Sequence, residues 1–402
     1  MPGFGLVKHV RIGGLIAKRW PSIPYRPQQG YFSFVLAAVL SAHGVASGGP
    51  AIAFRASGTL RMDNHRKQFG GGFTVLRVGE RWSITFKYEA QESAEEVVFD
   101  GAEVYTMTQN LLAPADDPVL MAQFNSALLR QTNGVLYARG GSGSVSSGPY
   151  PYGASSFARC IWLAFLSDAY LAGRTNTVMP VPWGELSTPD AYAFTLRAEF
   201  SNSVPPLPVT IAFVADQTRW QQAIRDHPLQ VSELPSVPFA PGFIGGAYTA
   251  TGWTNDLPRI PTSFQVVRFY TPGLITNSMQ LPAEKYTGHL EAFAALPGDY
   301  KIEPPRIPVP STVVDLRFRD SQFPLLGVPY WVTNGVWVKR GEVSPSLVET
   351  AKDSYASAIA ELSASNARPR LNRLVFLVSM LVAASLLGVI LLLGRGRRRP
   401  RT

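Results

Sequence analysis

The sequence is short of cysteine, of charge and of catalytic motifs. Its 402 residues include a single cysteine, Cys160, so no disulfide can form within the chain. For a body exported from the cytoplasm, this absence fits a bacterial envelope better than an animal secreted domain, which usually carries disulfides. Charged residues make up 16% of the chain, against about 25% in a typical soluble domain. With 46% hydrophobic residues, the chain can nevertheless bury a substantial core.

Signatures of catalysis and of metal binding are also missing. The chain has no HExxH motif, no paired cysteines, no phosphate-binding glycine loop and no G-x-S-x-G elbow. Cys160 lies in an apolar stretch, as a core cysteine does. We therefore assign no catalytic residue, no metal ligand and no cofactor, and we expect a non-catalytic protein. The alternative of an enzyme that assembles its active site from distant residues stays open.

The net charge of +9 is concentrated at the two ends of the chain. Residues 1–26 and 394–402 hold ten of the 37 basic residues and none of the 28 acidic residues. The body between them therefore has 27 basic and 28 acidic residues and is nearly neutral. Because a protein that neutralises nucleic-acid phosphates needs a basic face, this distribution argues against a nucleic-acid partner. Basic residues beside apolar segments are instead typical of membrane flanks.

The longest apolar segment, Leu374–Leu393, predicts a membrane helix. It contains twenty residues without a charge or a proline, enough to cross a hydrocarbon core of about 30 Å. Five arginines follow it and three precede it, which favours a cytoplasmic C-terminus. The alternative, a buried core helix, is disfavoured by the length, the lack of charge and the terminal position of the segment.

A second apolar segment, Tyr31–Ala46, follows a basic leader and ends in small residues. This order is typical of a secretory signal peptide, with cleavage after Ala46. The alternative is an uncleaved signal anchor, although sixteen residues are short for a span. Both interpretations place residues 47–373 outside the cytoplasm. We therefore expect a single-pass protein of the bacterial cell membrane, with a periplasmic or otherwise extracytoplasmic body.

Alternating residues predict that this body is mainly β. In residues 81–89, Trp82, Ile84, Phe86 and Tyr88 share one face, and polar residues share the other. A period of two residues indicates a strand with one buried face. Similar patterns predict further strands over residues 191–200, 209–213, 264–270 and 313–318.

Turn residues mark the ends of several strands. Gly70–Gly72 and Gly79-Glu80 punctuate the first strands, and Asp100-Gly101 predicts a tight hairpin. Asn334-Gly335 predicts a second hairpin within Tyr330–Val338. The region from residue 58 to residue 109 therefore predicts an antiparallel meander.

The predicted organisation is α+β, with a curved antiparallel sheet packed on a helix. Ser155–Leu171 predicts a buried helix that contains Cys160, and apolar residues spaced by three and four from Ser346 predict an amphipathic helix. The expected parts are a signal peptide or anchor (1–46), a β meander with the buried helix (47–215), a continuous second β-rich and proline-rich part (216–343), a stalk helix (344–369), the membrane helix (374–393) and a basic cytoplasmic tail (394–402).

The order of motifs in the meander resembles a known family. A strand led by Trp82 is followed by the Asp100-Gly101 turn and by the aromatic strand at Val104-Tyr105. This order resembles the periplasmic lipoprotein carriers of the Lol system over residues 54–215. The resemblance implies a strongly curved antiparallel sheet over a helix and an apolar concavity able to hold acyl chains. Family carriers are soluble or lipid-anchored, whereas this chain has a predicted membrane helix and further β sequence.

The candidate ligand-binding residues are Trp82, Ile84, Phe86 and Tyr88. As the lining of a curved sheet they would bind an apolar ligand such as a lipid or lipoprotein acyl chain. The alternative is that this face only packs on the helix that contains Cys160. A different functional alternative is a structural subunit of a bacterial envelope complex, which binds protein partners through its span and stalk.

Overall fold

The computed structural model describes residues 52–89, 93–110, 125–131, 135–137, 144–146, 149–151, 153–171, 181–183, 194–218, 242–255, 257–270, 281–320, 322–323 and 326–361. The predicted signal segment (1–46), the predicted membrane helix (374–393) and the basic tail (394–402) lie outside these residues. Within the described ranges, no helix combines the length and the apolar character needed to cross a membrane.

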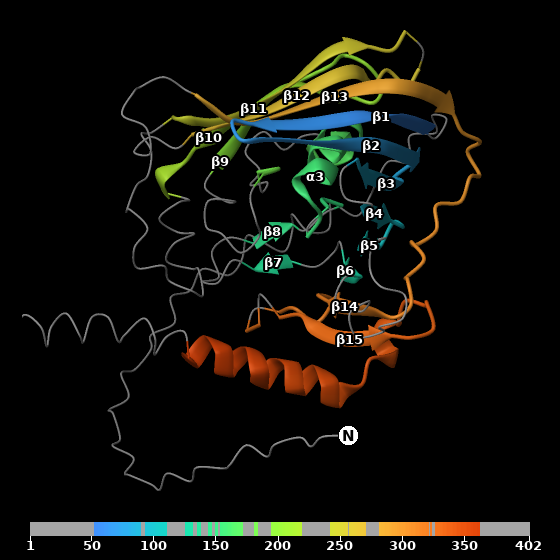
Figure 1. Ribbon diagram of the computed structural model, residues 1–402, viewed down its shortest axis with the longest axis vertical. Helices are drawn as coiled ribbons and strands as arrows, with labels where there is room; N and C mark the ends of the chain where they lie inside the picture. The colour runs from blue at the N-terminus through green and yellow to red at the C-terminus, as the bar shows by residue number, and fades with distance from the viewer. Residues whose placement is uncertain are drawn as a thin grey trace, which may run out of the picture. The chain divides into compact units, whose positions relative to one another are not determined.

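A large curved sheet of thirteen strands dominates the described part of the chain, as Figure 1 shows. The order across this sheet is β15-β14-β6-β5-β4-β3-β2-β1-β13-β12-β11-β10-β9, and β7 and β8 form a separate pair. The prediction of a mainly β, α+β fold with a curved antiparallel sheet on a helix is confirmed. In chain order the strands are β1 (Ala53–Asn64), β2 (Lys67–Val78), β3 (Arg81–Tyr88), β4 (Ser93–Phe99), β5 (Glu103–Asn110), β6 (Ser126–Gln131), β7 (Val135–Tyr137), β8 (Ser144–Ser146), β9 (Phe194–Phe200), β10 (Pro208–Ala215), β11 (Ile244–Trp253), β12 (Pro261–Phe269), β13 (Pro282–Ala295), β14 (Ser311–Asp315) and β15 (Val328–Val332).

The predicted meander is confirmed in β1 to β5, which pair antiparallel in chain order. The Asp100-Gly101 hairpin joins β4 to β5, and Gly101 has a φ of 105°. The Asp100 carboxylate accepts hydrogen bonds from the backbone N–H groups of Ala102 and Glu103, both at 2.8 Å. A side chain that accepts from the next backbone groups stabilises this turn locally.

Long-range pairs complete the sheet. β13 pairs antiparallel with β1, so strands from residues 216–343 join the same sheet as strands from residues 47–215. β14 pairs in parallel with β6, although the sequence pattern predicts only antiparallel pairs. Such pairs depend on contacts between distant residues, which no local alternation of side chains can specify.

The predicted Asn334-Gly335 hairpin is wrong. Gly335 has the positive φ of a tight turn, 71°, but the residues after it form no strand, and β15 pairs with β14 instead. The reason is Trp337, whose Nε1 donates to the carbonyl oxygen of Pro305 at 2.7 Å. Its ring also meets Tyr105 edge-on, with centroids 4.9 Å apart. These contacts hold the chain against the outer face of the sheet.

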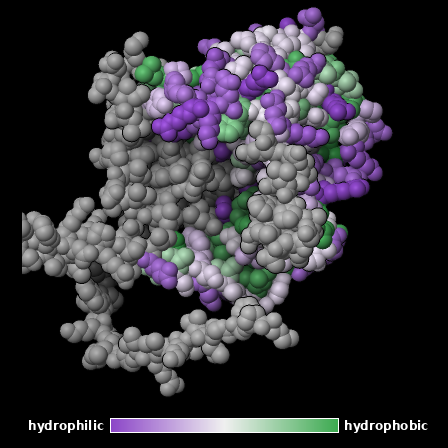
Figure 2. Space-filling model, viewed as in Figure 1, coloured by the Kyte–Doolittle hydropathy of each residue, from purple (hydrophilic) through white to green (hydrophobic). Residues whose placement is uncertain are grey.

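The sheet has a core on each side. On the concave side, the helix α3 (Ser156–Phe165) is buried against side chains of β1 to β4 and β9 to β13. On the convex side, Ile302, Ile307 and Trp337 cover part of β4 to β6. Figure 2 shows hydrophilic side chains gathered over the strands drawn at the top.

The predicted buried helix over 155–171 is divided in two. α3 ends at Phe165, and a short helix α4 (Asp168–Leu171) follows. Between them the hydroxyl of Ser167 donates to the carbonyl oxygen of Leu163 at 2.6 Å. A side chain that bonds to the backbone of the preceding turn competes with the regular helix pattern.

The C-terminal part of the described chain is helical, as predicted. A short 3₁₀ helix, η2 (Arg340–Glu342), precedes a helix over residues 345–361. This helix packs through Val348 and Ala351 on Leu326 and Val328 at the β15 edge of the sheet. Figure 1 shows it alongside β14 and β15.

Candidate functional site

The four residues predicted to bind ligand lie on the concave face of the sheet. β3 directs Trp82, Ile84 and Phe86 into the core, where each is at most 2% exposed, and Tyr88 is half-buried beside them. All four belong to or pack against the apolar cluster that contains α3. The structure therefore brings them together on one apolar face, and α3 lies against that face.

Aromatic rings make the contact between β3 and the helix. The ring of Phe86 stacks on that of Phe157 in α3, with centroids 4.6 Å apart and an interplanar angle of 15°. Tyr88 meets the same Phe157 ring edge-on, with centroids 5.7 Å apart. Pairs of this kind add about 0.5–1.5 kcal/mol to the free energy of burial. Aromatic contacts therefore stabilise the packing of α3 on β3.

Glycines beneath the rings shape the concavity. A Cβ atom on Gly71 would lie 2.9 Å from Phe86 Cζ, and one on Gly288 would lie 2.2 Å from Phe264 Cε1. The rings therefore lie directly over backbone, and glycine positions of this kind allow a sheet to curve. Gly70–Gly72, predicted to separate two strands, instead lie inside β2. Their role depends on the neighbouring strand, which the local sequence does not show.

A buried carboxylate, that of Glu95 in β4, holds the start of α3. Ser155 is the N-cap of the helix, and its hydroxyl accepts from the N–H of Ala158 at 3.3 Å. The backbone N–H of Ser155 donates to Glu95 Oε1 at 2.7 Å, and the Ser155 hydroxyl donates to Glu95 Oε2. Burial raises the pKa of Glu95, while the hydrogen bonds from Ser155 and the charge of Arg159 oppose this rise.

A buried ion pair holds the other end of the helical segment. Arg77 of β2 donates from Nη1 and Nη2 to the two carboxylate oxygens of Asp168 in α4, at 2.6 and 2.9 Å. Both side chains are 8% exposed. At the start of α3, the hydroxyl of Tyr286 also donates to Ser156 Oγ at 3.0 Å. Polar contacts with the sheet thus lie near both ends of the α3–α4 segment, and aromatic contacts lie between them.

Several buried polar groups of this core have no hydrogen-bond partner among the described residues. They are Nε1 of Trp82, Nε1 of Trp162 and the hydroxyl of Tyr248. A buried group left without its hydrogen bond costs about 1–3 kcal/mol. Indole nitrogens only donate, so a molecule that brought an acceptor to this region would satisfy them.

Cys160 is fully buried within the same core. Burial raises the pKa of its thiol far above the ordinary value, so the thiol stays neutral. A nucleophilic cysteine needs an accessible thiolate. The position therefore fits the interpretation of Cys160 as a core residue.

No protein-family model matches the chain, and no curated protein matches it. Some solved structures are similar to part of it. The LolA superfamily protein of Nitrosomonas europaea has 9% identity and a TM-score of 0.27, with 62% of this chain and 89% of that chain covered. An outer membrane lipoprotein-sorting protein domain of Vibrio parahaemolyticus has 8% identity and a TM-score of 0.28, with 62% and 87% covered. A DUF1329 family protein of Desulfovibrio piger has 7% identity and a TM-score of 0.28, with 67% and 92% covered.

The lipoprotein-carrier family that the meander resembles is among these neighbours, at identities of 7–9% and TM-scores of 0.27–0.28. These likenesses concern the arrangement of the chain, and none of them transfers a ligand or a residue role.

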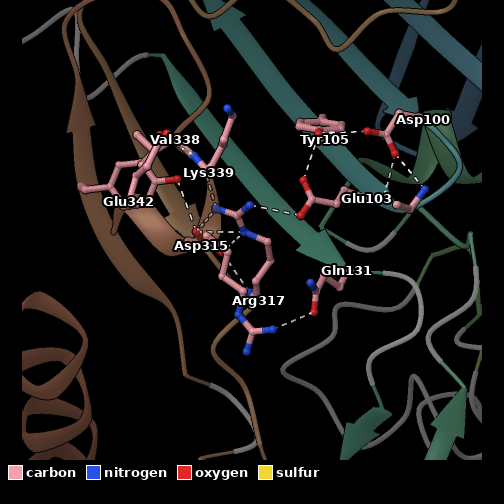
Figure 3. A network of polar contacts seen from close by, with 12 residues as sticks. Asp100, Glu103, Tyr105, Gln131, Asp315, Arg317, Val338, Lys339 and Glu342 are labelled. Atoms are coloured by element: carbon pink, nitrogen blue, oxygen red, sulfur yellow. Dashed lines mark hydrogen bonds and ion pairs between the residues drawn. The ribbon is translucent and has the colours of Figure 1, made fainter. Parts of the chain in front are cut away.

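A polar network that the sequence did not predict lies at the β14 end of the sheet, and Figure 3 shows it. Arg317 donates to Asp315 Oδ2 at 2.6 Å. It also donates at 3.1 Å to Oε1 of Glu103, which lies 214 positions earlier in the chain. The same guanidinium donates to the carbonyl oxygen of Val338 at 2.7 Å. Tyr105 donates to Glu103 at 2.9 Å. The network joins β14 to β5 and to the segment that covers the convex face.

Nothing in the described ranges gathers three potential metal ligands at one place. His65 contacts the carbonyl oxygen of Pro282 at 2.8 Å, and His289 lies 3.3 Å from Ser263 Oγ, both at exposed positions. On the concave face, α3 covers the apolar surface of β3, and a few buried donors of this core have no described partner.

Proposed function

We propose that the body binds acyl chains of lipids or lipoproteins on the concave face of its sheet, between the strands and α3, without catalysing a reaction. The observation that carries this proposal is the contact of two apolar surfaces. Nine of the ten residues of α3 are buried, and the sheet face opposite is lined by Trp82, Ile84 and Phe86. An acyl chain could replace helix side chains there and keep apolar surface out of water.

Hydrogen bonding makes it easier for an acyl chain to replace α3 on the sheet than to replace one of the strands. A helix satisfies its backbone groups internally, so it can separate from the sheet without leaving them unpaired. A strand that left the sheet would expose a row of unpaired N–H and C=O groups. Hydrogen bonds join the α3–α4 segment to the sheet near its two ends, at Ser155, Ser156 and Asp168. The aromatic contacts between these ends are the ones that a ligand would replace.

The unpaired donors near α3 favour an acyl ligand over a bare hydrocarbon. Nε1 of Trp82 and Nε1 of Trp162 have no described acceptor. An ester, amide or carboxyl group at the end of an acyl chain provides such an acceptor, and an alkane does not.

Cys160 allows a direct test, because it is the only cysteine of the chain and lies fully buried in α3. The full-length protein is treated with N-ethylmaleimide, with and without a long-chain fatty acid. We expect the fatty acid to change the rate at which the Cys160 thiol is alkylated. A fatty acid that carries a photoreactive diazirine should also crosslink to peptides of β3 and α3. Unchanged alkylation together with crosslinks only outside these elements would overturn the proposal.

A membrane anchor forms a second part of the proposal. The uncharged run at 374–393, followed by five arginines, supports a single span with the body outside the cytoplasm. A reporter active only in the cytoplasm, fused after residue 402, should be active, and carbonate washing should leave the intact protein in the membrane. Release by carbonate, or a reporter active only outside the cell, would contradict this part alone.

One observation favours a role in a protein complex as the second candidate function. Trp331 is 57% exposed and Val336 is 60% exposed, although large apolar side chains are usually buried. Crosslinking in cells with a photoreactive residue at position 331 should then capture one stoichiometric partner. Capture of no protein there would remove the support for this candidate.

A further inference from the structure

A groove lies between the helix over residues 345–361 and the β15 edge of the sheet. Its volume is about 350 Å³, within the range of about 300–1,000 Å³ that is usual for small-molecule sites. We call it the stalk groove. Apolar side chains form most of its wall, and Ser354 and Tyr355 contribute its polar atoms together with Thr350. The apolar wall is provided by Leu326, Pro329, Leu347 and Ala351.

A hydrogen-bonding group without a described partner is buried in the wall of the stalk groove. The hydroxyl of Tyr355 is buried, and no described residue bonds to it. The Tyr355 ring is held by Phe323, with centroids 5.9 Å apart and an interplanar angle of 71°. Because this hydroxyl has almost no accessible surface, a ligand that is mostly apolar and brings one acceptor would bond to it after a small shift of the wall.

The β15 edge disfavours a peptide strand as the occupant. The N–H groups of Thr312 and Leu316 donate to carbonyl oxygens on the β6 side of β14. The residues that alternate with them, Ser311, Val313 and Asp315, therefore bond to β15. In that register the outward backbone groups of β15 belong to Pro329 and Trp331. Since proline has no N–H, a peptide added to this edge would lose one of its few hydrogen bonds. A lipid chain needs no such ladder.

We propose that the stalk groove binds one acyl chain of a bilayer phospholipid, with the ester carbonyl oxygen accepting a hydrogen bond from the Tyr355 hydroxyl. Residues 362–373 connect the helix to the proposed span, and twelve residues reach at most about 42 Å when fully extended. The groove is therefore within reach of the bilayer surface. The bilayer as the source rests on the proposed membrane anchor, whereas the groove does not depend on ligand binding beside α3.

The test uses the full-length protein in vesicles of phosphatidylethanolamine and phosphatidylglycerol, with a trace of a phospholipid whose acyl chain carries a diazirine. Crosslinked peptides are identified by mass spectrometry. We expect adducts on residues 345–361 and on the segment around Leu326, in addition to adducts on 374–393. Tyr355→Phe should reduce the groove adducts by about two- to tenfold, as for the loss of one hydrogen bond. Tyr300→Phe, at an exposed tyrosine outside the groove, should leave them unchanged.

A second pair of variants tests the space itself. Ser354→Trp should fill the groove from an exposed position and abolish its adducts, whereas Ser357→Trp on the same helix should not. Groove adducts that persist in Ser354→Trp and in Tyr355→Phe would overturn the proposal. Capture of a protein segment instead of lipid by a benzophenone side chain at position 354 would overturn it too. A lack of adducts on 374–393 contradicts the anchor. Unchanged Cys160 alkylation, together with fatty-acid crosslinks only outside β3 and α3, contradicts the concave site, so these failures are distinguishable.

Discussion

Phe86 of β3 and Phe157 of α3 stack with ring centroids 4.6 Å apart, and this contact joins the most regular strand of the sequence to the central helix. Phe86 is fully buried, and its ring in turn covers Gly71 of the next strand. The Phe86 ring thus packs both on the glycine-containing strand β2 and on α3. Contacts of this kind contribute to the free energy of unfolding, which can be measured.

Removal of one ring should destabilise the fold strongly. Phe157→Ala deletes the ring that contacts Phe86 and Tyr88, and buried Phe→Ala changes cost about 3–5 kcal/mol. Urea unfolding followed by tryptophan fluorescence measures the loss. Val336→Ala, at an exposed position, is the control and should change the free energy of unfolding by less than about 0.5 kcal/mol. A Phe157→Ala loss below about 1 kcal/mol would show that the helix does not stabilise the sheet.

The Arg77–Asp168 pair should be costly to break and cheaper to replace. Asp168→Asn leaves the Arg77 guanidinium buried without its charge partner, which costs about 3–5 kcal/mol. The double variant Arg77→Met, Asp168→Leu should recover most of that loss, because neither charge is then buried. The measurement is the same urea transition, together with the rate of Cys160 alkylation. A double variant no more stable than Asp168→Asn would contradict this account.

Glu95 should make stability depend on pH in the direction opposite to an ordinary salt-bridged carboxylate. Because burial raises its pKa in the fold, the folded protein binds a proton more readily than the unfolded chain. The contribution of Glu95 to stability is therefore greatest below the ordinary glutamate pKa, and it falls as pH rises through the raised value. Glu95→Gln should abolish this fall. The check is the free energy of unfolding from about pH 4 to 8, with Glu303→Gln as the control for loss of one charge.

Arg317→Met should loosen the β14 end of the sheet. It leaves Asp315, which is fully buried, without the guanidinium that bonds to both of its oxygens. An uncompensated buried charge costs about 3–5 kcal/mol. Hydrogen exchange should therefore accelerate in Ser311–Asp315 and Val328–Val332, and much less in β2 and β3. Arg306→Met, at an exposed position, is the matched control. Uniform acceleration across the whole sheet would show that the network is not a local joint.

The sequence predicted strands well where alternation was local and poorly where a turn depended on distant contacts. The alternation of Trp82, Ile84 and Phe86 is sufficient to predict β3, because one face of that strand is buried along most of its length. Gly335 is equally clear as a turn residue, yet Trp337 packs on Tyr105 instead of continuing a hairpin. Tyr105, which the Trp337 ring contacts, lies more than 200 positions away in the chain, and Pro305, to which its indole donates, lies 32 positions away, so no local pattern shows either contact.

Some residues of the candidate site could likewise be predicted from the sequence, and others could not. The apolar face of β3 could be read from the sequence, and so could the buried helix that contains Cys160. Glu95, Arg77 and Asp168 could not, because each is an ordinary polar residue until the fold buries it beside its partner. The unpaired hydroxyl of Tyr355 likewise becomes informative only when the helix over 345–361 lies against β15.

Composition and local periodicity alone determined that this chain forms a mainly β body with a buried helix, because hydrophobic spacing decides which faces leave water. Only the tertiary structure decided which distant strands pair, how far the sheet curves and which polar groups are buried. These outcomes depend on contacts between residues far apart in the chain, and the free energy of such a contact exists only after both partners have been brought together.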